Sequence, residues 1–285
     1  MKLFVLTFLN GLTLAALYFL VASGFTLVFG LMRNVNLAHG SLYLLGAYIG
    51  FEVGDRMGSW FLAVVAGFVS AAIFGVLLQI LVFRRMEGQE LRQTMVTIGI
   101  SIVAADLMLA IWTGQTYQFE PPDWLYGATP LPFVKAYPTI RIMVLVVSVV
   151  VGVALWLFLT RTRIGMMIRA GVDDRGMLSA SGVNVQRVFA TTFAVGAGLA
   201  GFAGVVGGSA LSIAPGEDTR YLLASLIVVI VGGMGSVPGA AIGALVIGLA
   251  EQFGLAYSPT YSVVYTFVIM VAVLAIRPQG IMGRA

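Results

Sequence analysis

Residues 161–187 read RTRIGMMIRAGVDDRGMLSASGVNVQR, a long charged interruption in an otherwise apolar chain. This stretch holds five arginines against two aspartates, Asp173 and Asp174. A short arginine-rich loop between two membrane-spanning segments belongs on the cytoplasmic side by the positive-inside rule. Its apolar residues have no reason to face water, so we predict two short surface helices, broken near Gly171. We expect Asp173 to cap the second helix and Gly182 to end it.

The predicted pair of helices has two interpretations. A rigid, charged and partly apolar knob on the inner face can dock a soluble partner by placing a short helix in a groove of that partner. A plain connector that lies on lipid headgroups would carry the same residues. The physical features of this stretch alone do not separate the two.

The composition places the whole chain in the bilayer. Of its 285 residues, 60% are hydrophobic and only 10% are charged, whereas about a quarter of the residues of a soluble domain are charged. Most of the net charge of +4 comes from arginines in predicted loops, so it indicates membrane orientation and not nucleic-acid binding. With no cysteine and one histidine, the chain lacks the ligands for a disulfide framework or an all-protein zinc site.

The distribution of apolar runs predicts an all-α, polytopic single transmembrane domain over residues 1–285, with eight or nine hydrophobic segments. A spanning helix needs about 20 apolar residues. Six runs are long enough, at residues 4–31, 60–83, 95–112, 142–160, 188–211 and 262–276. Three are shorter and predict broken or re-entrant helices, at residues 41–53, 221–231 and 237–250. The first run is too long for the apolar region of a signal peptide, so we expect it to be retained as a helix.

Arginine placement predicts the topology. Arg84, Arg85 and Arg92 mark one loop as cytoplasmic, while the loop at about residues 114–140 is poor in basic residues and is expected outside. The C-terminal residues Arg277 and Arg284 return to the cytoplasmic side. The number of crossings then places the N-terminus outside.

Two interruptions resemble each other, RNVNLAHGS at residues 33–41 and GGMGSVPG at residues 232–239. Each places polar or helix-breaking residues between closely spaced apolar segments. Such backbone is tolerated at membrane depth only inside protein or along a wet cavity, and paired breaks indicate an internal repeat with a passage between its halves. The residues that we expect along this passage are Asn36, His39, Gly40, Ser41, Asp106, Gly235, Ser236, Pro238 and Gly239.

Two members of that set allow a second interpretation. Asp106 lies inside an apolar run, where a charge costs about 2.5–3.5 kcal/mol on insertion scales, so it must face a partner or a wet path. It could relay protons or, as we favour, be held by a neighbouring helix. His39 could act as a pH switch, but beside Asn36 and Gly40 we favour a role in satisfying the broken backbone.

Four stretches together resemble the LivH-type permease subunit of the branched-chain amino-acid ABC importers. They are GLTLAALYFLVASGFTLVFGLMRNVNLAHGSLYLLGAY at residues 11–48, TRIGMMIRAGVDDRGMLSASGVNVQRV at 162–188, GGMGSVPGAAIGALVIG at 232–248 and RPQGIMGR at 277–284. The resemblance implies a multi-pass permease of the bacterial inner membrane that translocates branched-chain or related small amino acids. It also implies three kinds of partner: a second permease of the same family, two cytoplasmic ATPase subunits and a periplasmic solute-binding protein.

By the same resemblance, residues 161–187 couple the permease to the ATPase, and the residues assigned to that role are Arg169, Asp173, Asp174, Arg175 and Gly182. Asp106 departs from the family pattern, which leaves the substrate open between amino acids and amides or urea. In such an importer the affinity resides in the solute-binding protein, so we expect no tight site in this chain. Acidic and basic residues near the outer ends, such as Glu217 and Glu251, contact that protein or, as we favour, are solvated.

No catalytic residues, cofactor or metal site are expected. The chain has no phosphate-binding loop and only two lysines, Lys2 and Lys135, so ATP must be hydrolysed by another chain. Two alternatives stay open. One is an ion-coupled secondary transporter that uses Asp106 and His39, and the other is a passive channel for urea-like solutes.

Overall fold

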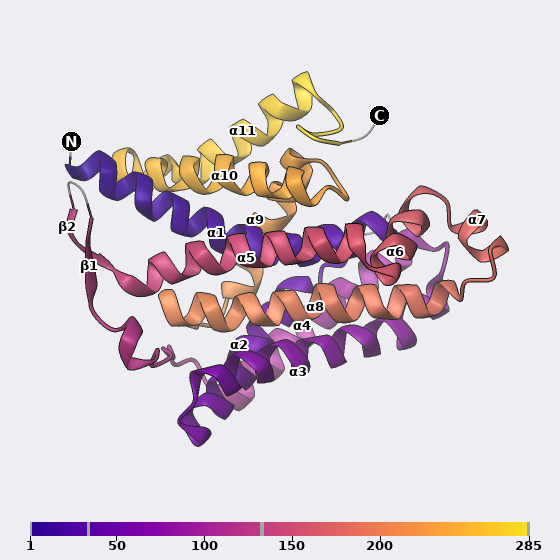
Figure 1. Cartoon of the computed structure of the whole chain (residues 1–285), viewed down its shortest axis with the longest axis horizontal. Coiled ribbons are helices and arrows are strands. Elements are labelled where there is room, and N and C mark those ends of the chain that lie inside the picture. Colours follow the sequence, from indigo (N-terminus) through magenta and orange to yellow (C-terminus); the bar gives the residue numbers. More distant parts are fainter. Residues whose placement is uncertain (1, 33–34, 132–133, 284–285) are drawn as a thin grey trace.

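The computed structural model describes residues 2–32, 35–131 and 134–283. Three residues used above, Arg33, Asn34 and Arg284, of which Arg33 and Asn34 belong to the first break, lie outside these ranges. The described chain is almost entirely helical, as predicted (Figure 1). Its long helices are α1 (Lys2–Met32), α2 (His39–Met57), α3 (Trp60–Leu81), α4 (Glu90–Trp112), α5 (Thr139–Arg161), α8 (Val185–Ala210), α9 (Glu217–Gly232), α10 (Val237–Tyr257) and α11 (Ser262–Ile276).

The shorter elements connect these helices. Two short helices, α6 (Arg163–Asp173) and α7 (Arg175–Ala180), occupy the arginine-rich stretch. Single 3₁₀ turns are η1 (Phe83–Met86), η2 (Asp123–Leu125) and η3 (Pro259–Tyr261). The loop between α4 and α5 also contains an antiparallel hairpin that the sequence did not predict, β1 (Ala128–Leu131) and β2 (Val134–Pro138), with Thr129 opposite Tyr137. The buried Tyr137 hydroxyl lies 2.8 Å from the Thr13 hydroxyl, which fixes the hairpin to α1.

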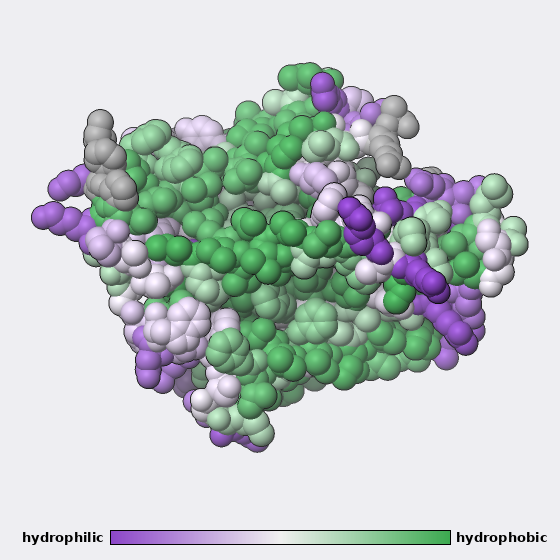
Figure 2. Space-filling view, in the orientation of Figure 1, coloured by the Kyte–Doolittle hydropathy of each residue, from purple (hydrophilic) through white to green (hydrophobic). Residues whose placement is uncertain are grey.

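The prediction of a polytopic membrane protein is confirmed. Among the described residues, seven helical segments are long and apolar enough to cross a bilayer. Figure 2 shows an apolar band across the middle of the molecule, with hydrophilic residues gathered at its two ends. On α5, Val146, Val149 and Val150 are 57–64% exposed, as expected for side chains that face lipid or another subunit. The predicted internal repeat stays a prediction.

One of the three short segments is longer than predicted. Helices α2 and α9, with 19 and 16 residues, are not among the seven candidate spans, which agrees with the broken segments expected there. Helix α10 has 21 residues and is one of the seven, so the prediction that it is too short to cross was wrong. It continues through Glu251, whose carboxylate accepts a hydrogen bond from the Tyr18 hydroxyl at 2.6 Å. A polar residue that is satisfied inside the protein does not end a helix.

Helix α1 is the centre of the molecule, and glycines let its neighbours approach it closely. A Cβ atom on Gly24 would collide with the carbonyl oxygen of Gly196 in α8, and one on Gly248 in α10 would collide with the backbone of Ala15. Gly46 of α2 lies in the same way against Gly201 of α8. Small residues at helix crossings are the expected device for packing in a membrane, where apolar surfaces alone give no association.

The two ends of the molecule are distinct. The N-terminus and the β1–β2 hairpin lie at one end, while α6, α7 and the C-terminus lie at the other (Figure 1). This arrangement agrees with the predicted topology, in which the N-terminus and residues 161–187 are on opposite sides.

Candidate functional site

The arginine-rich stretch folds into the two predicted short helices, here called the elbow (α6 and α7, residues 163–180). The break lies at Asp174 and not near Gly171, because Gly171 is buried in contact distance of Leu31 and Leu178 and α6 continues past it. The prediction that Asp173 caps the second helix was also wrong. Asp173 is the last residue of α6, and Asp174 has the extended backbone of a capping residue.

The caps of the elbow are complete. The Asp174 Oδ1 atom accepts hydrogen bonds from the backbone amides of Gly176 at 2.7 Å and Met177 at 3.1 Å. Gly182 follows α7 with a positive φ of 79° and its amide donates to the Ser179 carbonyl, so it terminates the helix as predicted. Defined caps at both ends make α7 a formed helix despite its six residues.

The elbow is anchored to the membrane domain by its inner face. Ile168 and Leu178 are buried in the core. The Arg175 guanidinium donates to the Leu31 carbonyl at the end of α1 and lies 5.2 Å from the centre of the Phe189 ring in α8. Arg175, which was expected on a docking surface, is therefore an anchor that caps α1 and stacks on α8.

The outer face of the elbow is mixed in character. Arg169, Asp173 and Asp174 are exposed. Met166 and Met177 are 47% and 69% exposed, although the helices that carry them, α6 and α7, lie at one of the two ends of the molecule where hydrophilic residues gather (Figures 1 and 2). Exposed methionines beside charged groups suit a surface that a protein partner covers.

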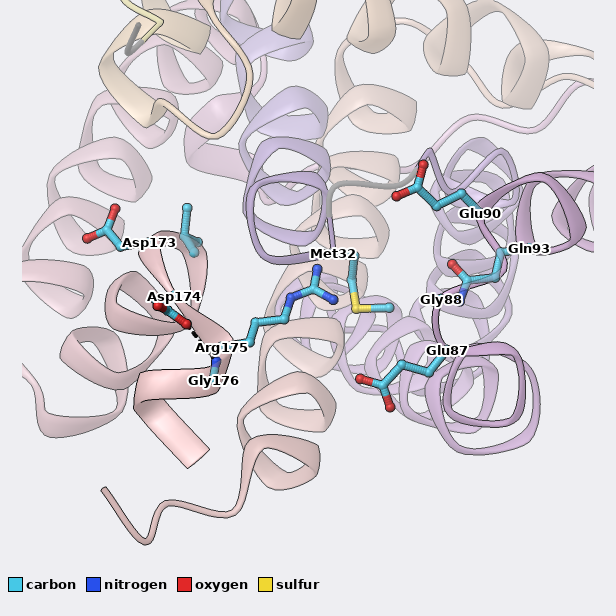
Figure 3. A pocket seen from close by; sticks show the side chains of 11 residues that line it. Met32, Glu87, Gly88, Glu90, Gln93, Asp173, Asp174, Arg175 and Gly176 are labelled. Atoms are coloured by element: carbon cyan, nitrogen blue, oxygen red, sulfur yellow. Dashed lines mark hydrogen bonds between the residues drawn. The ribbon is translucent and has the colours of Figure 1, made fainter. Parts of the chain in front are cut away.

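A pocket of about 400 Å³ separates the elbow from the start of α4 (Figure 3). Figure 3 shows the side chains of Arg175 and Met32 between the two aspartates on one side and Glu87 and Glu90 on the other. Four carboxylates and a single arginine are thus among the residues that line it. The sequence analysis missed Glu87 and Glu90, whose only signal was their position in the predicted cytoplasmic loop.

The turn that carries these two glutamates is fixed to its neighbours. Glu87 accepts a hydrogen bond at 3.0 Å from the side-chain amide of Gln186 in α8. Gln93 donates to the carbonyl oxygen of Met86 at 2.7 Å and is almost fully buried. The pocket is thus held by α1, α4, α6, α7 and α8 together.

The first predicted break is buried against α1. His39 is fully buried, its Nε2 atom lies 3.2 Å from the Val21 carbonyl oxygen, and its ring meets Phe25 edge-on. Asn36 is also buried and accepts a hydrogen bond from the Ala38 amide at 3.1 Å. Ser41 is buried one turn further, and a Cβ atom on Gly40 would collide with the Asp218 carbonyl oxygen of α9. Asn36 thus satisfies an amide of the break itself, whereas His39 contacts the carbonyl of Val21 inside α1, so the role favoured for His39 in satisfying the broken backbone stays a prediction.

The second predicted break lies against the same helix, closer to the end that carries the elbow. Gly233 and Gly235 have positive φ values of 108° and 80°, which explains why glycine is needed there. The Gly235 amide donates to the Thr26 hydroxyl of α1 at 3.2 Å. Ser236 caps α10 by accepting from the Gly239 amide, and Pro238 occupies the first turn of that helix, where a missing amide costs nothing.

The structure does not bring Asp106 to these breaks. Its side chain is exposed on α4 and, among the described residues, makes no hydrogen bond or ion pair. The expectation that a neighbouring helix of this chain holds it was wrong. Since a carboxylate facing lipid is costly, this face of α4 needs a cover from outside the chain.

The charges near the opposite end are partly paired. Arg220 lies 3.6 Å from Glu217 and 3.5 Å from Glu251, and the Glu251 side chain is only 16% exposed. The interpretation of Glu251 as a solvated helix end was wrong. Glu52 pairs with Arg56 one turn away, and its side chain is 41% exposed.

Removal of the Asp174 cap should loosen α7 specifically. Asp174→Ala removes the acceptor for two amides, and the loss of such a cap costs about 0.5–2 kcal/mol. We expect faster hydrogen exchange at the amides of Gly176 and Met177. Asp173→Ala is the matched control, because Asp173 caps neither amide. Equal exchange in the two variants would contradict the assigned cap.

Comparison with known proteins assigns the family. Residues 7–274 match the model of the family described as branched-chain amino acid transport system / permease component. The permease protein LivH of Salmonella typhimurium is 32% identical over 292 residues, covering 96% of this chain and 94% of the relative. The permease protein BraD of Pseudomonas aeruginosa is 32% identical over 290 residues with the same coverage.

A second kind of relative is more distant. The permease protein LivM of Salmonella typhimurium is 27% identical over 300 residues, covering 95% of this chain and 68% of the relative. No solved structure gives a significant match. The helical membrane architecture and the end-to-end match to LivH and BraD lead to one assignment: the chain belongs to the family of permease components of branched-chain amino acid transport systems.

Proposed function

We propose that this chain is the membrane-spanning subunit of an ATP-driven importer for branched-chain or related small amino acids in the bacterial inner membrane. The observation that carries the proposal is the elbow, a capped pair of helices that is anchored to α1 and α8 and exposes methionines beside charges. An ATPase subunit that seats this surface in a groove can move α1 directly, because Arg175 connects the two. Closure of two ATPase subunits on nucleotide would then rock the helices that pack on α1.

The pocket beside the elbow supports the same assignment. Glu87, Glu90, Asp173 and Asp174 give it an acidic lining, which complements a basic side chain of a partner. We assign the exposed Arg169 and Asp173 to surface recognition, whereas Asp174 lines the pocket and also caps α7. The roles of Arg175 and Gly182 are to position the elbow.

The second permease subunit is proposed to cover α4. Its exposed face carries Leu91, Met95, Ile102, Val103 and Leu107, each at least 57% exposed, with Asp106 among them. Lipid would cover the apolar residues without cost, but not the carboxylate. A partner subunit, or a water-filled passage between two subunits, can cover the apolar residues and also solvate or pair the Asp106 carboxylate. Asp106 then lines the joint path and not a path inside this chain.

The ion-coupled alternative has less support. His39 is fully buried, it contacts the Val21 carbonyl and the Phe25 ring, and the described residues place no carboxylate in hydrogen-bond contact with it. Asp106 is exposed on α4, so the two residues do not form a relay within the described chain.

Uptake in proteoliposomes tests the proposal. The chain is reconstituted with a second permease, an ATPase and a solute-binding protein of the same kind of importer, and leucine accumulation is measured. We expect accumulation to require both ATP and the binding protein, and to survive collapse of the proton gradient. Accumulation that needs the gradient and no ATPase would select the secondary transporter, and equilibration without accumulation would select the channel.

A further inference from the structure

A second pocket, of about 260 Å³, lies at the end of the molecule opposite the elbow. Its rim includes Asn10 of α1, Arg141 in the first turn of α5 and Ser212 just after α8. Figure 1 shows that these ends of α1, α5 and α8 lie beside the N-terminus and the β1–β2 hairpin. In the proposed topology the pocket therefore belongs to the outer half of the permease. Pockets for drug-sized ligands measure roughly 300–1,000 Å³, so this one suits a smaller solute.

Charges of both signs line this pocket. Arg220 is 44% exposed at its side chain and is placed between two carboxylates, with Glu217 3.6 Å away and Glu251 3.5 Å away. The Tyr18 hydroxyl donates to the other oxygen of Glu251 at 2.6 Å, so Glu251 is already engaged and acts as a support for Arg220. Glu217 lines the pocket itself. Arg141 contributes a second cation, which donates to the Asn10 side-chain oxygen at 2.6 Å.

The pocket also has an apolar lining. Leu14 and Leu17 of α1 are buried beside the charged groups, and Leu211 is 38% exposed at the rim. An arrangement of two guanidinium groups, one carboxylate and three leucines matches the parts of one solute class. The solute carries a carboxylate, an ammonium group and an aliphatic side chain.

We propose that this pocket recognises the zwitterion of an aliphatic amino acid on its way into the permease. Arg220 and Arg141 receive the carboxylate, Glu217 receives the ammonium group, and the three leucines contact the side chain. The inference rests on the proposed function and adds a recognition site for its substrate, which urea and neutral amides would not fit because they have no separated charges to pair. The existing ion pairs of Arg220 are partly exposed and contribute little, so a solute can exchange for them and leave again. Such a site holds its solute weakly, which a passage requires.

A structural role for the same charges is the competing explanation. Arg220 and Glu251 also join α9 to α10, and their pairing would persist with no solute. The test therefore needs a measurement of occupancy and not only of uptake. Because the chain contains no cysteine, a single introduced cysteine can report occupancy of the pocket without background from other thiols of this chain.

The experiment uses Ser212→Cys, which places the only thiol of this chain at the rim of the pocket. The assembled transporter is held in right-side-out vesicles without binding protein, and the rate of thiol modification by a membrane-impermeant methanethiosulfonate is measured. We expect modification from outside, slowed several-fold by millimolar leucine or valine. Isoamylamine, which lacks the carboxylate, isocaproate, which lacks the ammonium group, and urea should leave the rate unchanged.

Charge-removing variants then test which side chains bind the carboxylate and the ammonium group of the solute. In the Ser212→Cys background, Arg220→Gln or Glu217→Gln should raise the leucine concentration needed for protection by roughly tenfold or more, as expected when one partner of a charge pair is removed. Arg56→Gln is the matched control, since Arg56 pairs with Glu52 on α2 and lies outside the pocket. It should keep normal protection.

Three results would overturn the inference: no modification from outside, equal protection by isoamylamine and isocaproate, or full protection in Arg220→Gln. Uptake by the wild-type transporter in the same vesicles, measured with ATP inside and with binding protein added outside, separates this outcome from the proposed function. ATP-driven leucine uptake without protection rejects the pocket alone. Protection by leucine without ATP dependence rejects the ATP-driven mechanism alone.

Discussion

Met177→Asp is expected to abolish ATP-driven uptake while the protein stays folded in the membrane. Met177 is 69% exposed on α7 and contributes apolar surface at the end of the molecule that carries the elbow. If the ATPase covers this residue, an aspartate there places an unpaired charge in a desolvated contact. The loss of one such anchor costs at least about 2 kcal/mol, which is more than tenfold in association. The measurements are copurification of the ATPase subunit with the permease and leucine uptake in proteoliposomes.

The control for this variant is Met57→Asp. Met57 is 66% exposed at the end of α2, on the side of the molecule opposite the elbow. It carries the same change in size and charge, and it should leave both the copurification and the uptake intact. Normal uptake by Met177→Asp would show that α7 is not covered by the ATPase, and the elbow would then be a connector on the lipid surface.

The elbow shows which structural features can be predicted from a sequence pattern and which cannot. Its two helices and the terminating Gly182 followed from local rules about apolar content, capping residues and glycine. The choice between Asp173 and Asp174 as the cap did not, since both can accept the amides of a following helix. Contacts decide it: Gly171 packs on Leu31 of α1, which keeps α6 helical until Asp173.

The anchoring of Arg175 to α1 follows the same logic. Its partner, the Leu31 carbonyl, is 144 residues away in the sequence. From the sequence alone, an arginine in a charged loop is predicted to be solvated. Only the folded structure shows that an unpaired helix end lies beside it. The same limit applies to Glu251 and Tyr18, which are 233 residues apart. Sequence periodicity predicts elements, but it does not pair polar groups across the fold.

Gly201→Leu is expected to prevent folding of the membrane domain. Gly201 of α8 lies against both α2 and α3, and a Cβ atom there would collide with the Gly67 carbonyl oxygen of α3. Gly46 of α2 packs against the Gly201 backbone from the other side. Overpacking a core costs about 1–3 kcal/mol when side chains can move, and more when the obstacle is backbone. We expect aggregation in detergent and no folded peak in size-exclusion chromatography.

Gly99→Leu is the matched control, because a Cβ atom on this glycine of α4 meets no atom within 4 Å. Its helix has the same length class and the same apolar character, so insertion into the membrane is equally favourable in both variants. Within this chain the two changes differ in whether a neighbouring backbone lies against the glycine, so the comparison uses the chain purified without its proposed partner subunit. A folded Gly201→Leu protein with a wild-type melting temperature would mean that α2, α3 and α8 do not meet at this point, and the packing around the first break would need to be reassigned. A milder change, Gly201→Ala, should fold but melt at a lower temperature, because a single methyl group forces the three helices apart without separating them.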